Sequence, residues 1–111
     1  MRLKSKIKFA DEKLKYQFDQ MKISSRKEKE IFVFIEQAFH NLEENCFCGT
    51  QIPKKLIPKE YIKKYGIDNC WKYNLPGAWR LIYSIERDEV VVLSVILEWL
   101  KHKDYEKRFN Y

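Results

Sequence analysis

Apolar and polar residues alternate at the beginning of the chain and again through much of its C-terminal half. Residues 2–9 read RLKSKIKF, which places Leu3, Ser5, Ile7 and Phe9 on one side of an extended chain and basic residues on the other. Residues 71–75 and 79–85 alternate in the same way on either side of a Pro-Gly turn. A period of two is typical of half-buried strands, so we predict a strand for each segment.

A fourth strand is predicted from a different pattern. Residues 90–97, VVVLSVIL, are apolar along their whole length, which is typical of a central strand covered on both faces. The preceding ERDE, residues 86–89, is predicted to be a four-residue hairpin loop.

Between the first and second predicted strands, the apolar residues have the spacing of helices. Apolar residues recur every three or four positions from about Ala10 to Met21 and again behind Ser25. Ser25 followed by Glu28 forms a capping box, which predicts the start of the second helix. The short link between the two helices predicts that they run antiparallel. After Trp99 the chain is predicted to end in a basic helix or tail.

A connector between the helices and the C-terminal strands is interrupted by Gly49, Pro53 and Pro58. Its last part, PKEYIKKYGI, is predicted to form a helical turn closed by Gly66. The complete order predicts an α+β fold for residues 1–111 as a single domain. Two N-terminal antiparallel helices would pack on a mostly antiparallel four-stranded sheet, in the order β-α-α-β-β-β, and leave the other face of the sheet uncovered.

Charge points to polyanionic partners. The chain has 22 Lys and Arg against 16 Asp and Glu, a formal net charge of +6 and a pI near 9.2. Between Gln51 and Arg80, seven cations stand against two acids. Alternatively, these lysines only keep the surface soluble. Because no apolar run is long enough to span a membrane and the N-terminus lacks a signal-peptide core, we expect a cytoplasmic protein.

The cysteines and one histidine give little indication of a disulfide framework or a metal site. Cys46, Cys48 and Cys70 are odd in number, which argues against a disulfide framework. They could form a zinc site with His40, but the spacing of Cys46 and Cys48 is shorter than usual, so we expect packed thiols and no metal. His40 is expected to be an ordinary helix residue.

Residues 70–96, CWKYNLPGAWRLIYSIERDEVVVLSVI, followed by HKDYEKRF at 102–109, resemble the C-terminal half of the RelE/ParE superfamily of toxins from toxin-antitoxin modules. The likeness lies in a strand around Arg80 and Tyr83, a short acidic hairpin and a valine-rich strand. It implies a RelE-like two-layer domain, and a toxin that cleaves mRNA on the ribosome as an endoribonuclease (an mRNA interferase). The ParE branch implies a gyrase inhibitor instead.

The resemblance also implies roles for individual residues. Arg80 would hold the scissile phosphate, Lys72 would be a catalytic lysine, and His102 and Tyr105 would take part in proton transfer or stacking. Asn74 stands where the RelE branch carries a second lysine. RNA contacts are predicted for Asn74 and for lysines of the connector and tail: Lys54, Lys55, Lys59, Lys63, Lys64, Lys101 and Lys103.

The chemistry of these side chains fits phosphate transfer without a cofactor. A planar guanidinium on a strand can bind two phosphate oxygens, and histidine can accept and donate protons near neutral pH. Lys72 and Arg80 should share one sheet face, where their mutual repulsion would be relieved by a bound phosphate. Alternatives are that Arg80 pairs with Glu86 or Asp88, that Lys72 only faces solvent, and that Glu98 is the base. Trp99 could be a stacking platform, but a place in the core is favoured.

Three functions stay open from the sequence. The first is a metal-independent endoribonuclease, which would act on mRNA and the ribosome and be neutralised by a small acidic antitoxin. The second is a ParE-like gyrase inhibitor without catalysis, and the third is an inactive module that binds RNA or a partner. None of them requires a membrane or a small-molecule cofactor.

Overall fold

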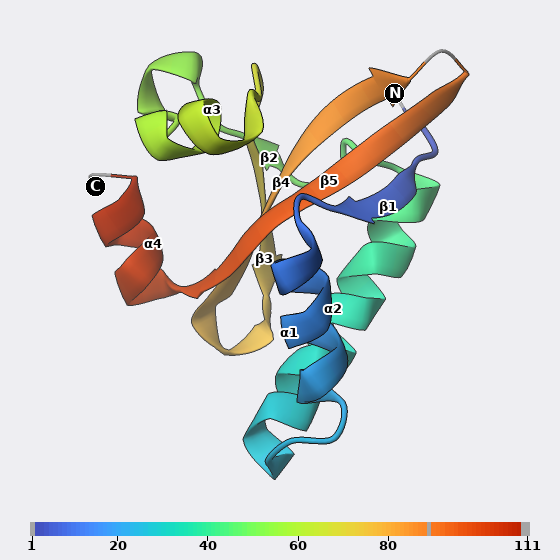
Figure 1. The fold of residues 1–111 in the computed structure, drawn as a ribbon, viewed down its shortest axis with the longest axis vertical. Helices are drawn as coiled ribbons and strands as arrows, with labels where there is room; N and C mark the ends of the chain where they lie inside the picture. Colours follow the sequence, from blue (N-terminus) through green and yellow to red (C-terminus); the bar gives the residue numbers. More distant parts are fainter. Residues whose placement is uncertain (1, 89, 110–111) are drawn as a thin grey trace.

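Five strands form one sheet in the computed structural model, which describes residues 2–88 and 90–109. The strand order is β1-β5-β4-β3-β2, and β1 alone runs parallel to its neighbour, β5 (Figure 1). The strands are β1 (Lys6–Phe9), β2 (Thr50–Gln51), β3 (Trp71–Leu75), β4 (Trp79–Asp88) and β5 (Val91–Lys101). The α+β class and the mostly antiparallel sheet are confirmed, but the predicted count of four strands is wrong. The strand that was missed, β2, has two residues and pairs with β3.

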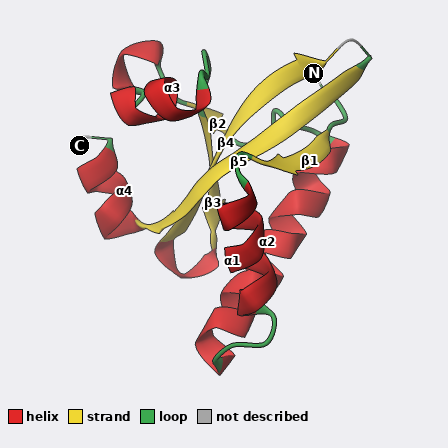
Figure 2. Ribbon diagram, in the orientation of Figure 1, coloured by secondary structure: helices red, strands yellow, loops and turns green. Residues whose placement is uncertain are grey.

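Two helices, α1 (Glu12–Met21) and α2 (Arg26–Glu44), run in opposite directions and cover one face of the sheet (Figures 1 and 2). Each begins at a capped residue. The Asp11 carboxylate accepts a hydrogen bond from the Leu14 amide, and the Ser25 hydroxyl accepts one from the Glu28 amide. Their apolar stripes meet the inward side chains of β4 and β5 in a first core. Its fully buried members include Ile35, Ala38, Leu42, Leu81, Tyr83 and Ile96.

The opposite face of the sheet is also covered, which corrects the expectation that it would be open. Helix α3 (Lys59–Tyr65), the 3₁₀ turn Lys54–Leu56 and helix α4 (His102–Arg108) pack there in a second core. Its members include Ile57, Tyr61, Ile82, Leu97, Leu100, Tyr105 and Phe109. Gly66 closes α3 in the left-handed conformation, as predicted. The C-terminal helix and the helical turn of the connector therefore complete a third layer.

The hairpin between β4 and β5 is tighter than the predicted four-residue loop. Asp88 pairs with Val91, so Glu86, Arg87 and Asp88 belong to β4. The remaining residue of the predicted loop, at position 89, lies outside the described residues. Strands β4 and β5 are long enough to reach from this hairpin to the end of the sheet where α4 begins.

A β-bulge in β5 changes which side chains face the second core. Tyr83 pairs with Ile96 and Ile82 pairs with Glu98, so Leu97 has no opposite residue on β4. Leu97 and Glu98 therefore both project toward α3 and α4, although adjacent strand residues normally point to opposite faces.

Candidate functional site

Lys72, Asn74 and Arg80 lie on one face of the sheet, as the alternation predicted. Asn74 pairs with Arg80 and Lys72 pairs with Ile82, so Lys72 and Arg80 are diagonal neighbours on adjacent antiparallel strands. This is the face that also carries the second core. Lys72 and Arg80 are half-buried, whereas Asn74 is exposed.

Arg80 is held by contacts with the end of the sheet and with α4. Its Nη2 lies 3.2 Å from Nδ1 of His102, and its Nη1 donates to the backbone carbonyl of Trp79 at 3.1 Å. Its Nε is buried and has no hydrogen-bond partner within the described part of the chain. The alternative that Arg80 pairs with Glu86 or Asp88 is wrong, because these residues lie six and eight positions further along the same strand, about 20 and 26 Å away.

His102 is also close to a carboxylate. Its Nε2 lies 2.8 Å from Oε1 of Glu106, one helical turn further along α4. Because a guanidinium can only donate, the contact with Arg80 requires Nδ1 to accept, which leaves the proton of the neutral ring on Nε2. Glu106 then accepts that proton in a hydrogen bond. Glu106 was not predicted from the sequence, although its spacing of four residues from His102 was visible once a helix is assumed.

Tyr105 lies beneath Lys72. The Lys72 ammonium is 5.1 Å from the centre of the Tyr105 ring, in cation–π geometry. The ring is only 1% exposed and stacks on Phe109 at a centroid distance of 4.6 Å. Both faces of the ring are thus occupied, so the predicted stacking of Tyr105 on an RNA base does not fit this structure. Its visible role is to support Lys72 and to anchor α4.

The predicted RNA-binding lysines are exposed, and their surroundings differ. Lys55 and Lys59 border a groove of about 820 Å³ together with Lys107 and Arg108 of α4. Lys64 pairs with Asp11 at 3.8 Å, and Lys101 lies over the Trp79 ring at 5.7 Å. The other predicted lysines are solvent-exposed side chains of the connector and of α4: Lys54, Lys63 and Lys103.

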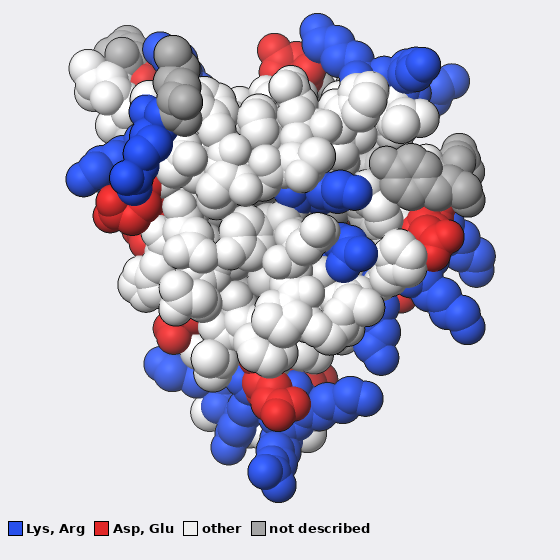
Figure 3. Space-filling view, turned by 180° about the vertical axis from the view of Figure 1, so that it is seen from behind, with Lys and Arg blue, Asp and Glu red and all other residues white. Residues whose placement is uncertain are grey.

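Basic side chains also gather outside the predicted connector. In Figure 3 they cluster at the end of the molecule where α1 joins α2, and only a few lie within a broad uncharged area above it. The exposed cations of this end are Lys22, Arg26, Lys27 and Lys29. The exposed basic side chains of the described residues are therefore not confined to the sheet face that carries Arg80.

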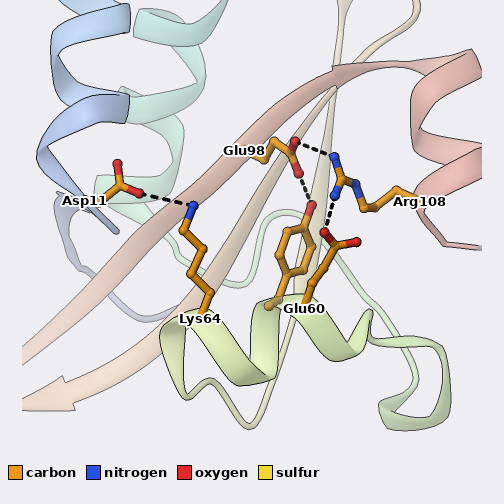
Figure 4. A network of polar contacts seen from close by, with 6 residues as sticks. Asp11, Glu60, Lys64, Glu98 and Arg108 are labelled. Carbon is orange, nitrogen blue, oxygen red and sulfur yellow. Dashed lines mark hydrogen bonds and ion pairs between the residues drawn. The ribbon is translucent and has the colours of Figure 1, made fainter.

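A second polar cluster ties α4 to α3 and the sheet (Figure 4). Glu98 accepts hydrogen bonds from the Tyr61 hydroxyl and, at 3.1 Å, from Arg108, which also binds Glu60. These side chains border a cavity of about 320 Å³. Burial and the hydrogen bond to Glu98 raise the pKa of Tyr61. Partial burial acts to lower the pKa of Arg108, but the bond to Glu60 and the charge of Glu98 outweigh it.

This cluster changes the interpretation of Glu98. Both carboxylate oxygens are engaged, one by Tyr61 and the other by Arg108, so Glu98 serves to anchor α4 and does not fit the alternative of a free base. Trp99 is half-buried and packs against the first core with an edge contact to Phe18, which agrees with the favoured core position.

The remaining candidates lie away from this site. His40 is exposed on α2, 3.8 Å from Glu43. All three cysteines are free, and burial raises the pKa of the Cys70 thiol to about 12, as expected of a thiol packed among apolar side chains. Within residues 2–88 and 90–109, no group of three or more His, Cys, Asp and Glu side chains is arranged to hold a metal ion.

Comparisons leave the family open. The chain matches no family model, no curated protein and no solved structure among those with which it was compared. The resemblance to the RelE/ParE superfamily therefore stays a prediction. No helix in the described part of the chain is long and apolar enough to cross a membrane.

Proposed function

We propose that the protein is a toxin of the RelE/ParE type and an endoribonuclease that cleaves mRNA by attack of the 2′-hydroxyl on the adjacent phosphate. The observation that carries the proposal is the contact of Arg80 with His102, 3.2 Å apart on a sheet face that also presents Lys72. A guanidinium, which can bind phosphate, and an imidazole nitrogen, which can accept a proton, would thus lie within reach of the same phosphodiester.

The three side chains would divide the reaction between them. Nδ1 of His102 would take the proton of the 2′-hydroxyl as its oxygen forms a bond to phosphorus. Arg80 would balance the charge that develops on the non-bridging oxygens, and such stabilisation is usually the largest contribution. The Lys72 ammonium would donate a proton to the 5′-oxygen as the P–O5′ bond breaks. The products are a 2′,3′-cyclic phosphate and a 5′-hydroxyl.

Arg80 would have to change partner during this cycle. In the free protein its Nη2 faces the lone pair that His102 needs as a base. An arriving phosphate is a stronger acceptor than a neutral imidazole nitrogen, so it would draw the guanidinium away and expose Nδ1. The base would become available only when substrate is bound.

The surface supports an mRNA substrate and an acidic partner. The groove beside α4 carries Lys55, Lys59 and Lys107, and the end of the α1–α2 hairpin carries four further cations. A nucleic-acid strand and an acidic antitoxin would each be attracted to basic regions of this kind. The ribosome, where phosphates are dense, would be the place of action in the cytoplasm.

One observation keeps a non-enzymatic function as a second candidate. Asn74 is exposed at the position where the resemblance implies a second lysine, directly opposite Arg80. A gyrase inhibitor of the ParE type, or a module that only binds RNA, would not need that lysine.

Induced expression in a bacterial host separates these functions. The proposal predicts growth arrest and transcripts cut to 5′-hydroxyl ends by the wild-type chain and by Arg87→Gln, a control on an exposed cation of the same strand. Arg80→Gln should abolish both effects. DNA breaks with intact transcripts would indicate gyrase inhibition, and growth without any effect would overturn a toxin function.

A further inference from the structure

His102 lies between a cation and an anion that come from different elements. Arg80 of β4 faces its Nδ1 at 3.2 Å, and Glu106 of α4 faces its Nε2 at 2.8 Å. The three groups form a line of carboxylate, imidazole and guanidinium across the junction of sheet and helix. The histidine and the glutamate are each about half exposed, with side-chain exposures of 50% and 46%.

The two contacts are mutually consistent only for one arrangement of protons. Nδ1 must offer its lone pair to the guanidinium, so Nε2 carries the proton and donates it to the carboxylate. Glu106 thereby fixes the ring with Nδ1 toward Arg80 and toward a phosphate bound there. After Nδ1 takes up a proton, the same carboxylate faces an imidazolium, and the hydrogen bond becomes charge-assisted at both ends.

We propose that Glu106 is the positioning residue of His102, an inference that rests on the proposed ribonuclease function. It would hold Nδ1 at the reacting 2′-hydroxyl and stabilise the imidazolium formed when the proton is transferred. Its spacing of four residues from His102 places it on the same face of α4. An aspartate at this position would have a shorter reach, so Glu106→Asp should restore only part of the function.

The second histidine of the chain provides a matched comparison. His40 and Glu43 also form an imidazole–carboxylate pair within one helix, but the contact is longer, 3.8 Å, and lies on the exposed surface of α2. Replacement of Glu43 therefore removes a carboxylate beside a histidine without touching the site.

Single-turnover cleavage of an mRNA on ribosomes tests the role of Glu106. Glu106→Ala should lower the cleavage rate constant about tenfold, whereas the affinity for RNA and the rate of Glu43→Ala stay within about twofold of the wild type. His102→Ala should lose about a hundredfold or more. If Glu106 acts through His102, adding Glu106→Ala to His102→Ala should change the rate by less than about twofold.

Two outcomes of this comparison of single and double variants would overturn the inference, each for a different reason. A tenfold loss from Glu106→Ala that persists in the His102→Ala background would show that Glu106 does not act through His102, and no loss at all would show that it has no role. Either result leaves the ribonuclease function intact. Absence of cleavage by the wild-type chain would instead overturn the proposed function itself.

A nitrogen-15 NMR measurement of the imidazoles tests the geometry without any activity. The chain has two histidines, so a His40→Gln variant leaves the signals of His102 alone. The neutral ring should show a protonated Nε2 and an unprotonated Nδ1. In Glu106→Ala the resonance of the Nε2 proton should broaden through faster exchange with water. A neutral ring protonated on Nδ1 would contradict the arrangement.

Discussion

Arg80 and His102 are separated by 22 positions in the sequence, and their side chains meet at 3.2 Å where β5 passes into α4. The pairing of Arg80 with Leu100 fixes one side of this contact, because it sets the strand register beside the first residue of α4. The other side depends on how α4 packs. The geometry of the site is therefore only as stable as the attachment of α4 to the sheet.

Arg108→Met should weaken that attachment. The substitution leaves the half-buried Glu98 with only its hydrogen bond from Tyr61 and leaves the exposed Glu60 without a cation, and loss of hydrogen bonds between charged groups costs about 1–3 kcal/mol. Urea unfolding should show a loss in this range, and hydrogen exchange of the α4 amides should be faster. Lys107→Met, at an exposed neighbouring position, is the control and should change stability by less than about 0.5 kcal/mol. Equal effects of the two variants would contradict an anchoring role for Arg108.

Tyr105→Ala should destabilise the protein through the second core. The ring is 1% exposed and stacks on Phe109, so its removal leaves a cavity that costs about 3–5 kcal/mol. Tyr16→Ala serves as a comparison, because Tyr16 is 64% exposed and its loss should be small. Thermal and urea unfolding measure both. If Tyr105→Ala unfolds like Tyr16→Ala, α4 does not pack as described.

Asp11 should make the free energy of unfolding depend on pH in the acidic range. Its hydrogen bond from the Leu14 amide lowers the pKa of the carboxyl below 3.8, with help from Tyr65 and Lys64. A carboxyl with a lower pKa in the folded state stabilises that state above its unfolded pKa, and the contribution is lost as the pH falls through the folded pKa. Asp11→Ala should therefore cost about 1 kcal/mol at pH 7, and less as the pH drops below 3.8.

The control for this titration is Asp19→Ala, which removes an exposed carboxylate paired with Lys15 on the same helix. Its cost at neutral pH should be about 0.3–0.5 kcal/mol, as is typical of surface pairs four residues apart. Urea unfolding of the three proteins from pH 7 to pH 3 gives the free energies. A constant difference between wild type and Asp11→Ala across that range would rule out the proposed role of the carboxylate.

The sequence predicted those features of the structure that depend on a local pattern of residues. The Ser25 cap, the alternation around Arg80 and Gly66 at the end of α3 each depend on neighbouring residues, and each was predicted. The layer formed by α3 and α4 was not, because its apolar side chains are scattered through the connector and the tail. The bulge that directs Glu98 toward Arg108 also leaves no local pattern, since it is a property of strand register.

The candidate site shows the same division. Shared placement of Lys72 and Arg80 follows from strand alternation, and the structure has it. The contact between Arg80 and His102 depends on the direction in which the chain leaves β5, and the burial of Tyr105 depends on the packing of α4. Neither can be read from spacing along the sequence.

Cleavage of mRNA on purified ribosomes, compared between Arg80→Lys and the wild type, decides whether the Arg80 guanidinium binds the reacting phosphate. Lysine keeps the positive charge but cannot bind two phosphate oxygens or reach His102 with the same geometry. We expect cleavage to 2′,3′-cyclic phosphate ends by the wild type and Arg87→Lys, and a loss of cleavage rate of about a hundredfold or more in Arg80→Lys. Cleavage by Arg80→Lys at the wild-type rate would contradict this role of Arg80.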